Sequence, residues 1–211
     1  LKMFRDPGFR VLIASALCMS AVQQFYTVYA NPYLRELGAA KPMALQTLAQ
    51  VSEVICLASF PVVLARLGFK VTLALAVLGW VVRNAIFATG SLPFIALVGL
   101  PLHGVCFTFF FVVTNVYVDR HAPSHLRASA QGILAFIASG LGVLLGNFIS
   151  ARTLEISRAD TSTSWAGFWL VPAAVAGVVF VLFVTFFRET TPAAVEAARV
   201  GSARAEPVAA S

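Results

Sequence analysis

Six side chains in apolar segments of the chain carry the chemistry needed to bind a polar solute. They comprise two amides, a hydroxyl, a carboxylate, an imidazole and a phenyl ring: Gln24, Thr27, Gln50, Glu53, His103 and Phe107. Amides bind hydrogen-bonding edges, a phenyl ring stacks on a planar ring, and a carboxylate accepts hydrogen bonds from hydroxyls or changes protonation state in a low-dielectric cavity. The set predicts a site for a polar, ring-containing solute rather than for an ion or a lipid.

The spacing of two pairs supports this prediction. Gln50 precedes Glu53 by three residues and His103 precedes Phe107 by four, so each pair shares one face of a helix. Glu53 lies near the middle of its apolar segment, where a charge costs about 2.5–3.5 kcal/mol on insertion scales. A carboxylate can bind or release a proton in a low-dielectric cavity, which makes Glu53 a candidate for handling protons as well as solute. For His103, the alternative is a packing role.

One further charge, Arg83, lies inside an apolar segment. It has two structural interpretations. In the first, Arg83 forms a buried ion pair with Glu53. In the second, its aliphatic stem crosses apolar surroundings so that the guanidinium reaches the membrane surface. The first interpretation makes Glu53 a structural residue as well. Arg83 is therefore predicted to be structural.

Composition indicates a membrane protein. Hydrophobic residues make up 59% of the chain and charged residues 11%, whereas soluble domains have about 25% charged residues. The mean hydropathy is +0.86. In so apolar a chain the net charge of +6 is no sign of nucleic-acid binding. Segments of about 20 apolar residues span a bilayer as helices. The sequence predicts an all-α membrane protein with six transmembrane helices, over residues 9–33, 43–65, 70–90, 93–118, 129–150 and 165–187.

Basic residues in the loops predict the orientation. If the N-terminal side is called inside, ten Lys and Arg residues lie inside and four outside, with Arg83 within a helix. Positively charged loops favour the cytoplasm, so both termini are expected there. Residues 1–188 are predicted to form the six-helix domain. Residues 189–211, rich in Ala, Glu and Arg, are predicted to form a mobile cytoplasmic tail.

The sequence carries no motif for other chemistry. It has no H-E-x-x-H, no G-x-S-x-G and no glycine-rich phosphate loop. Its three cysteines all stand in apolar runs, where they are expected to pack rather than to hold a metal or form disulfides. No enzyme activity, metal or cofactor is predicted. Gly142 and Gly146 form a G-x-x-x-G step, which predicts close helix packing rather than a solute contact.

Four segments taken together resemble one transporter family. They are QFYTVYANPYL at 24–34, QVSE at 50–53 with RLGFK at 66–70, GWVVRNAIFATG at 79–90, and the most specific one, 103–132, which ends in YVDRHAPSHLRASAQG. In this order they resemble the C-terminal half of nucleoside:proton symporters of the major facilitator superfamily. The resemblance covers nearly the whole chain except its C-terminal end.

The resemblance implies helices seven to twelve of a twelve-helix fold, with a solute site near the membrane midplane and alternating access. It also implies a nucleoside as the solute, protons as the coupling ion and the bacterial inner membrane as the location. The N-terminal six-helix half would be the missing partner. The chain is thus expected to be a fragment of a longer transporter, with a natural half-transporter as the alternative. By motif, the six residues named at the start match the family's solute positions.

Three positions depart from the pattern that the resemblance implies. The family commonly has tyrosine where His103 stands, an acid where Thr108 stands and asparagine where Thr27 stands. Without an acid at 108, Glu53 is the acidic candidate for proton coupling in this half, and His103 is expected to share that role. Two other functions stay open. One is a major facilitator for another polar solute, such as a sugar, and the other is a six-helix subunit or remnant that transports nothing.

Overall fold

The computed structural model describes residues 6–158 and 163–189, and helices account for most of them. This confirms the predicted all-α class. The α-helices are α1 (Pro7–Glu36), α2 (Pro42–Ala88), α3 (Leu92–Phe94), α4 (Leu102–Phe107), α5 (Val113–His121), α6 (Arg127–Ala135), α7 (Val143–Ser157) and α8 (Trp165–Phe186). Three π-helical turns, η2 (Ile95–Gly99), η3 (Thr108–Val112) and η5 (Phe136–Gly142), and one 3-10 turn, η4 (Ser124–Leu126), connect some of them. The predicted tail, 189–211, lies outside the described residues except for Glu189.

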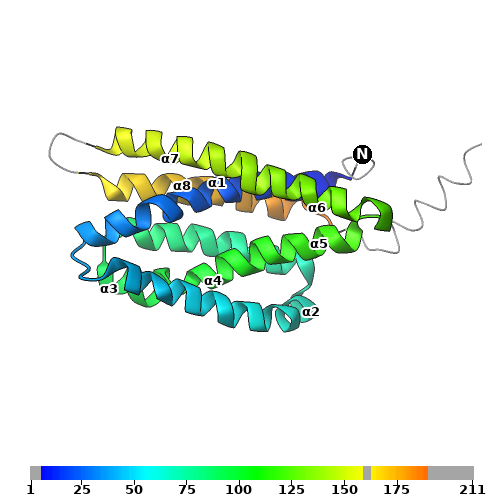
Figure 1. The fold of residues 1–211 in the computed structure, drawn as a ribbon, viewed down its shortest axis with the longest axis horizontal. Coiled ribbons are helices and arrows are strands. Elements are labelled where there is room, and N and C mark those ends of the chain that lie inside the picture. The colour runs from blue at the N-terminus through cyan, green and yellow to red at the C-terminus, as the bar shows by residue number, and fades with distance from the viewer. Residues whose placement is uncertain (1–5, 159–162, 190–211) are drawn as a thin grey trace, which may run out of the picture.

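The longest helix, α2, is a hairpin of two arms. It spans 47 residues but breaks at Gly68, which has φ 72°. A positive φ of this kind suits glycine, which has no Cβ to clash, so the chain reverses there. Figure 1 shows the arms, 42–67 and 69–88, running antiparallel. Five stretches of the described chain are long and apolar enough to cross a membrane, with α2 counted once. Division at Gly68 gives the six predicted helices.

We call each of these six helical segments a rod, numbered in chain order. Two of the rods contain π-helical turns. The fourth rod runs from α3 to α5 through η2 and η3, and the fifth runs from η4 to α7 through η5. π-Helical turns inside α-helices occur often at functional sites. The predicted ranges 93–118 and 129–150 are shorter than these rods, because the helices continue through polar residues beyond each apolar segment.

Both ends of the described bundle lie together. A Cβ on Gly8, at the start of α1, would be 2.5 Å from the carbonyl oxygen of Arg188, just after α8. A Cβ on Gly68 would be 3.7 Å from a carboxylate oxygen of Glu189, so the α2 turn lies at this end as well. In Figure 1 the α5–α6 connection is also there. This agrees with an even number of crossings and with the predicted grouping of loops.

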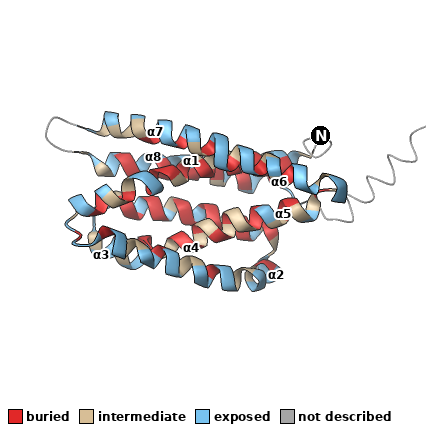
Figure 2. Cartoon of the chain, viewed as in Figure 1, coloured by how far each residue is buried: buried red, intermediate tan, exposed pale blue. Residues whose placement is uncertain are grey.

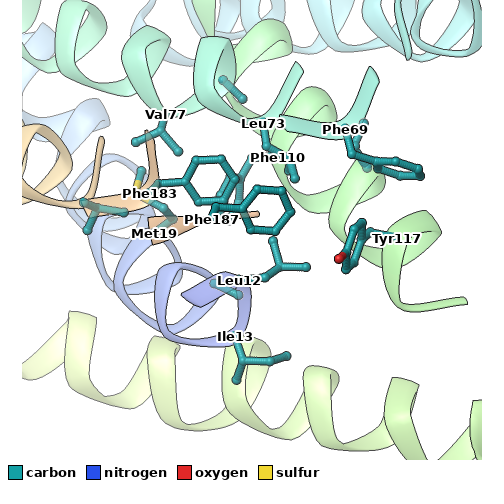
Figure 3. Packing of buried hydrophobic residues seen from close by; sticks show 14 of the residues in the cluster. Leu12, Ile13, Met19, Phe69, Leu73, Val77, Phe110, Tyr117, Phe183 and Phe187 are labelled. Atoms are coloured by element: carbon teal, nitrogen blue, oxygen red, sulfur yellow. The ribbon is translucent and has the colours of Figure 1, made fainter. Parts of the chain in front are cut away.

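Two buried clusters hold the rods together. The cluster near the N-terminal end joins α1, the second arm of α2, the fourth rod and α8 (Figure 3). In it, the rings of Phe183 and Phe187 stack with centroids 4.5 Å apart, and Tyr117 meets Phe69 edge-on at 5.1 Å. The other cluster, which includes Trp169, joins α1, α2 and α8 at the opposite end.

The outer faces of the bundle are apolar as well. Figure 2 shows long exposed stretches on α7 and on the first arm of α2. Leu144, Phe148 and Ile156 of α7 and Val54 and Ile55 of α2 are more than half exposed. Apolar faces of this extent suit contact with lipid or with another membrane-embedded surface rather than with water.

Candidate functional site

A close contact between α2 and α4 brings Glu53 and His103 together. A Cβ on Gly104 would lie 2.5 Å from the carbonyl carbon of Ser52 and 2.7 Å from the backbone nitrogen of Glu53. The Gly104 N–H also donates a hydrogen bond of 3.1 Å to the Ser52 hydroxyl. Because glycine has no side chain, α4 can approach the first arm of α2 this closely. The residues next in sequence, Glu53 and His103, therefore face each other.

Glu53 and His103 form the charged centre of the site. Glu53 Oε2 lies 3.8 Å from His103 Nε2, an ion pair whenever the imidazole is protonated. The His103 side chain is 9% exposed and the Glu53 side chain 28% exposed. An accessible carboxylate next to a buried imidazole is an arrangement that can receive and pass on a proton. The structure thus brings together both predicted proton-coupling residues.

Two aromatic rings stack on the imidazole of this pair. His103 stacks on Phe107 with centroids 5.5 Å apart and planes 28° apart, as their four-residue spacing predicts. His103 also stacks on Tyr26 of α1, with centroids 5.1 Å apart and planes 29° apart. Tyr26 was not among the predicted site residues. No local spacing relates it to His103, because the contact depends on how α1 and α4 pack.

Arg83 takes neither of the two arrangements that the sequence suggested for it. It is 1% exposed and therefore does not reach the surface of the bundle. The salt bridges among the described residues join Glu53 to His103 and do not include Arg83. Its guanidinium carbon instead lies 3.8 Å from the ring centroid of Tyr26, 5.1 Å from that of Trp80 and 5.5 Å from that of Phe87. Ring faces attract a cation, so this aromatic cage stabilises the buried charge.

A cavity of about 330 Å³ lies beside Phe107, between α1, the fourth rod and the fifth rod. Its polar side chains are amides and hydroxyls, and no charged side chain lines it within the described part of the chain. The η3 and η5 turns contribute part of its wall. Two polar atoms at the cavity, Gln23 Oε1 and Thr114 Oγ1, are buried without a hydrogen-bond partner among the described residues, so a solute or water can satisfy them. The polar lining residues are Ser20, Gln23, Gln24, Thr114, Asn115 and Ser139.

The G-x-x-x-G step of the fifth rod positions Gln24. A Cβ on Gly142 would be 2.6 Å from Ser20 Cβ, and one on Gly146 would be 2.6 Å from the carbonyl oxygen of Ala21 and 2.8 Å from Gln24 Cγ. The two glycines therefore let the rod contact α1 along one face. This confirms the predicted packing role.

The six predicted residues do not form one constellation. Gln24 and Phe107 line the cavity, and Phe107 also stacks on His103 of the charged pair. Thr27 is exposed, and its hydroxyl donates a 3.2 Å hydrogen bond to the carbonyl oxygen of Gln23 on its own helix. Gln50 is exposed on α2. These two do not contribute to the cavity wall.

Sequence reasoning missed other residues of the cavity. Asn115 follows Phe107 by eight residues and Phe111 by four, so helical spacing could have identified it. Ser139 and Thr114 gave no such signal, because small hydroxyl residues are common throughout apolar helices.

The most specific segment of the chain, 103–132, proves largely structural beyond Asn115. Asp119 and Arg127 form a 3.3 Å salt bridge across the turn between the fourth and fifth rods. Gln131 donates a 2.9 Å hydrogen bond to the carbonyl oxygen of Asn115. The salt bridge links the two rods at their turn, and the hydrogen bond links them next to Asn115, which lines the cavity.

The bundle and its site define the class of protein first. This is a multi-pass membrane protein, and its fold matches about half of the fold of a solved membrane transporter. The crystal structure of the nucleoside transporter NupG matches with a TM-score of 0.79 at 24% identity, over 90% of this chain and 50% of that one.

The family follows from the sequence comparison. The model of the nucleoside H+ symporter family matches residues 1–192, so the chain belongs to that family and is not an enzyme. It is 31% identical over 201 residues to a protein of Escherichia coli K12 named "Putative nucleoside transporter YegT", and 26% identical to the xanthosine permease of the same organism. The matches cover 90% and 88% of this chain but 47% and 48% of those proteins. The chain therefore spans about half the length of these curated relatives.

Proposed function

We propose that the chain forms helices seven to twelve, the C-terminal half, of a proton-coupled nucleoside transporter in a bacterial inner membrane. The missing N-terminal half would supply the other wall of a central solute site, and rocking of the two halves would open it to either side. The ordered segments from 24 to 132 support assignment to this half. The ten-to-four distribution of basic residues supports two cytoplasmic ends.

One observation carries this proposal: the Glu53–His103 pair stands next to a cavity lined by uncharged polar groups. Phe107 connects the two, because its ring stacks on His103 of the pair and also lines the cavity. Its ring offers a stacking surface, and the amides and hydroxyls offer both donors and acceptors. A nucleoside has these features, being a planar base joined to a polyhydroxy sugar without a charge. A sugar as the solute would have no planar base to stack on the Phe107 ring.

Proton coupling is assigned to Glu53 with His103. Thr108, at the position where the resemblance implies an acid, is fully buried and does not line the cavity. Glu53 is the carboxylate that meets the imidazole, and it is the more exposed of the two. In this mechanism, a proton on the His103 imidazole strengthens its attraction to the Glu53 carboxylate in one state of the transporter. Proton loss weakens it in the other state.

The test is uptake by the complete transporter in cells, with radiolabelled uridine, adenosine and glucose supplied with and without a protonophore. We expect uptake of the two nucleosides, abolished by the protonophore, and no uptake of glucose. Uptake of glucose instead would favour a sugar transporter. Uptake of none of the three would favour the non-transporting subunit.

A further inference from the structure

We propose that Tyr26 is a positioning residue that holds the His103 imidazole in line with Glu53, and that Arg83 holds Tyr26 in place. The effect on proton coupling rests on the function proposed above, whereas the effect on the orientation of the ring does not. The assignment comes from four groups on four rods: Tyr26 on α1, Glu53 and Arg83 on the two arms of α2, and His103 on α4.

The first step concerns what orients the imidazole. A functional histidine usually has its ring fixed by a hydrogen bond at the nitrogen that does not react. Here His103 Nδ1 is buried and has no hydrogen-bond partner among the described residues. What remains is the contact of Nε2 with Glu53 and the two stacked rings, Tyr26 and Phe107. The rings therefore replace the missing hydrogen bond in defining the plane of the imidazole.

The second step separates the two rings. Phe107 is on the same helix as His103 and also borders the cavity, so it is free to respond to a solute. Tyr26 is only 8% exposed and packs edge-on against Phe87 at 6.0 Å. Of the two rings that stack on the imidazole, Tyr26 is thus the fixed one, and Phe107 is the one that a solute can move.

The third step explains why Tyr26 is fixed. The Arg83 guanidinium carbon lies 3.8 Å from the centroid of the Tyr26 ring, in the aromatic cage completed by Trp80 and Phe87. A planar guanidinium stacks on a ring in a way that a lysine ammonium does not. Pairwise contacts therefore connect Arg83 to Tyr26, Tyr26 to His103 and His103 to Phe107. This gives a buried cation that has no carboxylate partner among the described residues a role beyond packing.

The titratable groups that face His103 come from each element packed against it. They are Tyr26 on α1, and Glu53 and Arg83 on the two arms of α2. Loss of the Tyr26 ring changes none of the formal charges of Glu53 or Arg83. A change in the pH profile of uptake on its removal would therefore report the position of the imidazole.

The test uses the complete transporter and three variants. Tyr26→Leu removes the ring, Tyr26→Phe keeps it, and Arg83→Lys keeps the charge but loses the planar stacking. The matched control is Tyr29→Leu, one turn along α1, where the ring meets Phe168 edge-on at 5.1 Å. The readout is the ratio of uridine uptake at about pH 5.5 to that at about pH 7.5, values on either side of the range in which imidazole titrates.

We expect Tyr26→Leu to lower this ratio by about twofold to tenfold, the factor that one aromatic pair is worth. Arg83→Lys should lower it less, and Tyr26→Phe and Tyr29→Leu should leave it unchanged. Tyr26→Leu should add nothing in a His103→Gln background. A ratio that survives both Tyr26→Leu and Arg83→Lys would overturn the proposal, as would an equal loss in Tyr26→Phe.

A second readout is independent of transport. In the purified transporter, the ring protons of His103, identified by their loss in His103→Gln, should show ring-current shifts in the NMR spectrum. These shifts should shrink in Tyr26→Leu and persist in Tyr26→Phe. If neither uridine nor adenosine is taken up, the proposed function fails and the NMR result alone decides the positioning role. Unchanged shifts in Tyr26→Leu would refute it.

Discussion

Gly104 and Ser52 are in direct backbone contact, because a Cβ on Gly104 would lie 2.5 Å from the Ser52 carbonyl carbon and oxygen. Gly104→Ala must therefore push α4 away from α2 and separate His103 from Glu53. Overpacking of this kind costs about 1–3 kcal/mol. We expect a lower thermal unfolding temperature and a lower rate of uptake in the complete transporter. Gly177→Ala on α8 is the control, since nothing lies within 4 Å of its added Cβ. Equal effects of the two substitutions would contradict the prediction.

Glu53→Gln should impair proton coupling more than folding. The amide keeps the size of the side chain but can no longer form an ion pair with His103. We expect uptake at about pH 5.5 to fall by about tenfold, or ~1.4 kcal/mol, and to lose most of its dependence on pH. Unchanged uptake would remove Glu53 from the site.

His103→Gln tests the other member of the pair. If the imidazole exchanges the proton, this variant should flatten the pH profile of uptake between about pH 5.5 and about pH 7.5. The measurement is initial uptake normalised to the amount of transporter in the membrane. A wild-type profile would leave His103 with the packing role that the sequence also allows.

Filling the cavity should block the solute. Ser139 lines the cavity on η5, so a Trp there would occupy much of its volume of about 330 Å³. We expect Ser139→Trp to lower nucleoside uptake by about tenfold or more while the protein still reaches the membrane. Leu144→Trp, on an outer face where the native side chain is 66% exposed, is the matched control. Equal uptake by the two variants would argue against solute binding in the cavity.

The Asp119–Arg127 salt bridge should contribute little to stability. Both side chains are 49% exposed, so water and salt screen the interaction. Asp119→Asn should cost at most about 1 kcal/mol in a thermal or denaturant unfolding experiment, and the cost should shrink at high salt. A larger or salt-independent loss would mean that the pair is shielded by a part of the protein outside the described residues.

The positions of the crossings could be predicted from the sequence, because apolar length alone determines them. Proline and glycine marked the turns, and Gly68 divides α2 within the predicted loop between 65 and 70. The π-helical turns in the fourth and fifth rods could not be predicted. They change hydrogen bonding within a helix without changing its apolar character.

The candidate site was predictable only where its contacts run along one helix. The His103–Phe107 stack follows from a four-residue spacing. The pairing of Glu53 with His103 rather than with Arg83, and the stacking of Tyr26, depend on the rotation and depth of neighbouring rods. That rotation is set by contacts such as that of Gly104 with Ser52, which become recognisable only when both helices are seen.

The contact between Gly8 and Arg188 has a consequence for protein engineering. Since the start of α1 and the end of α8 touch, a short peptide could join them, and new ends could be opened in the turn between α1 and α2 at the opposite end of the bundle. Such a circular permutant would preserve the contacts described for this half. The packing of the six rods would then be tested apart from the order in which the helices follow one another along the chain.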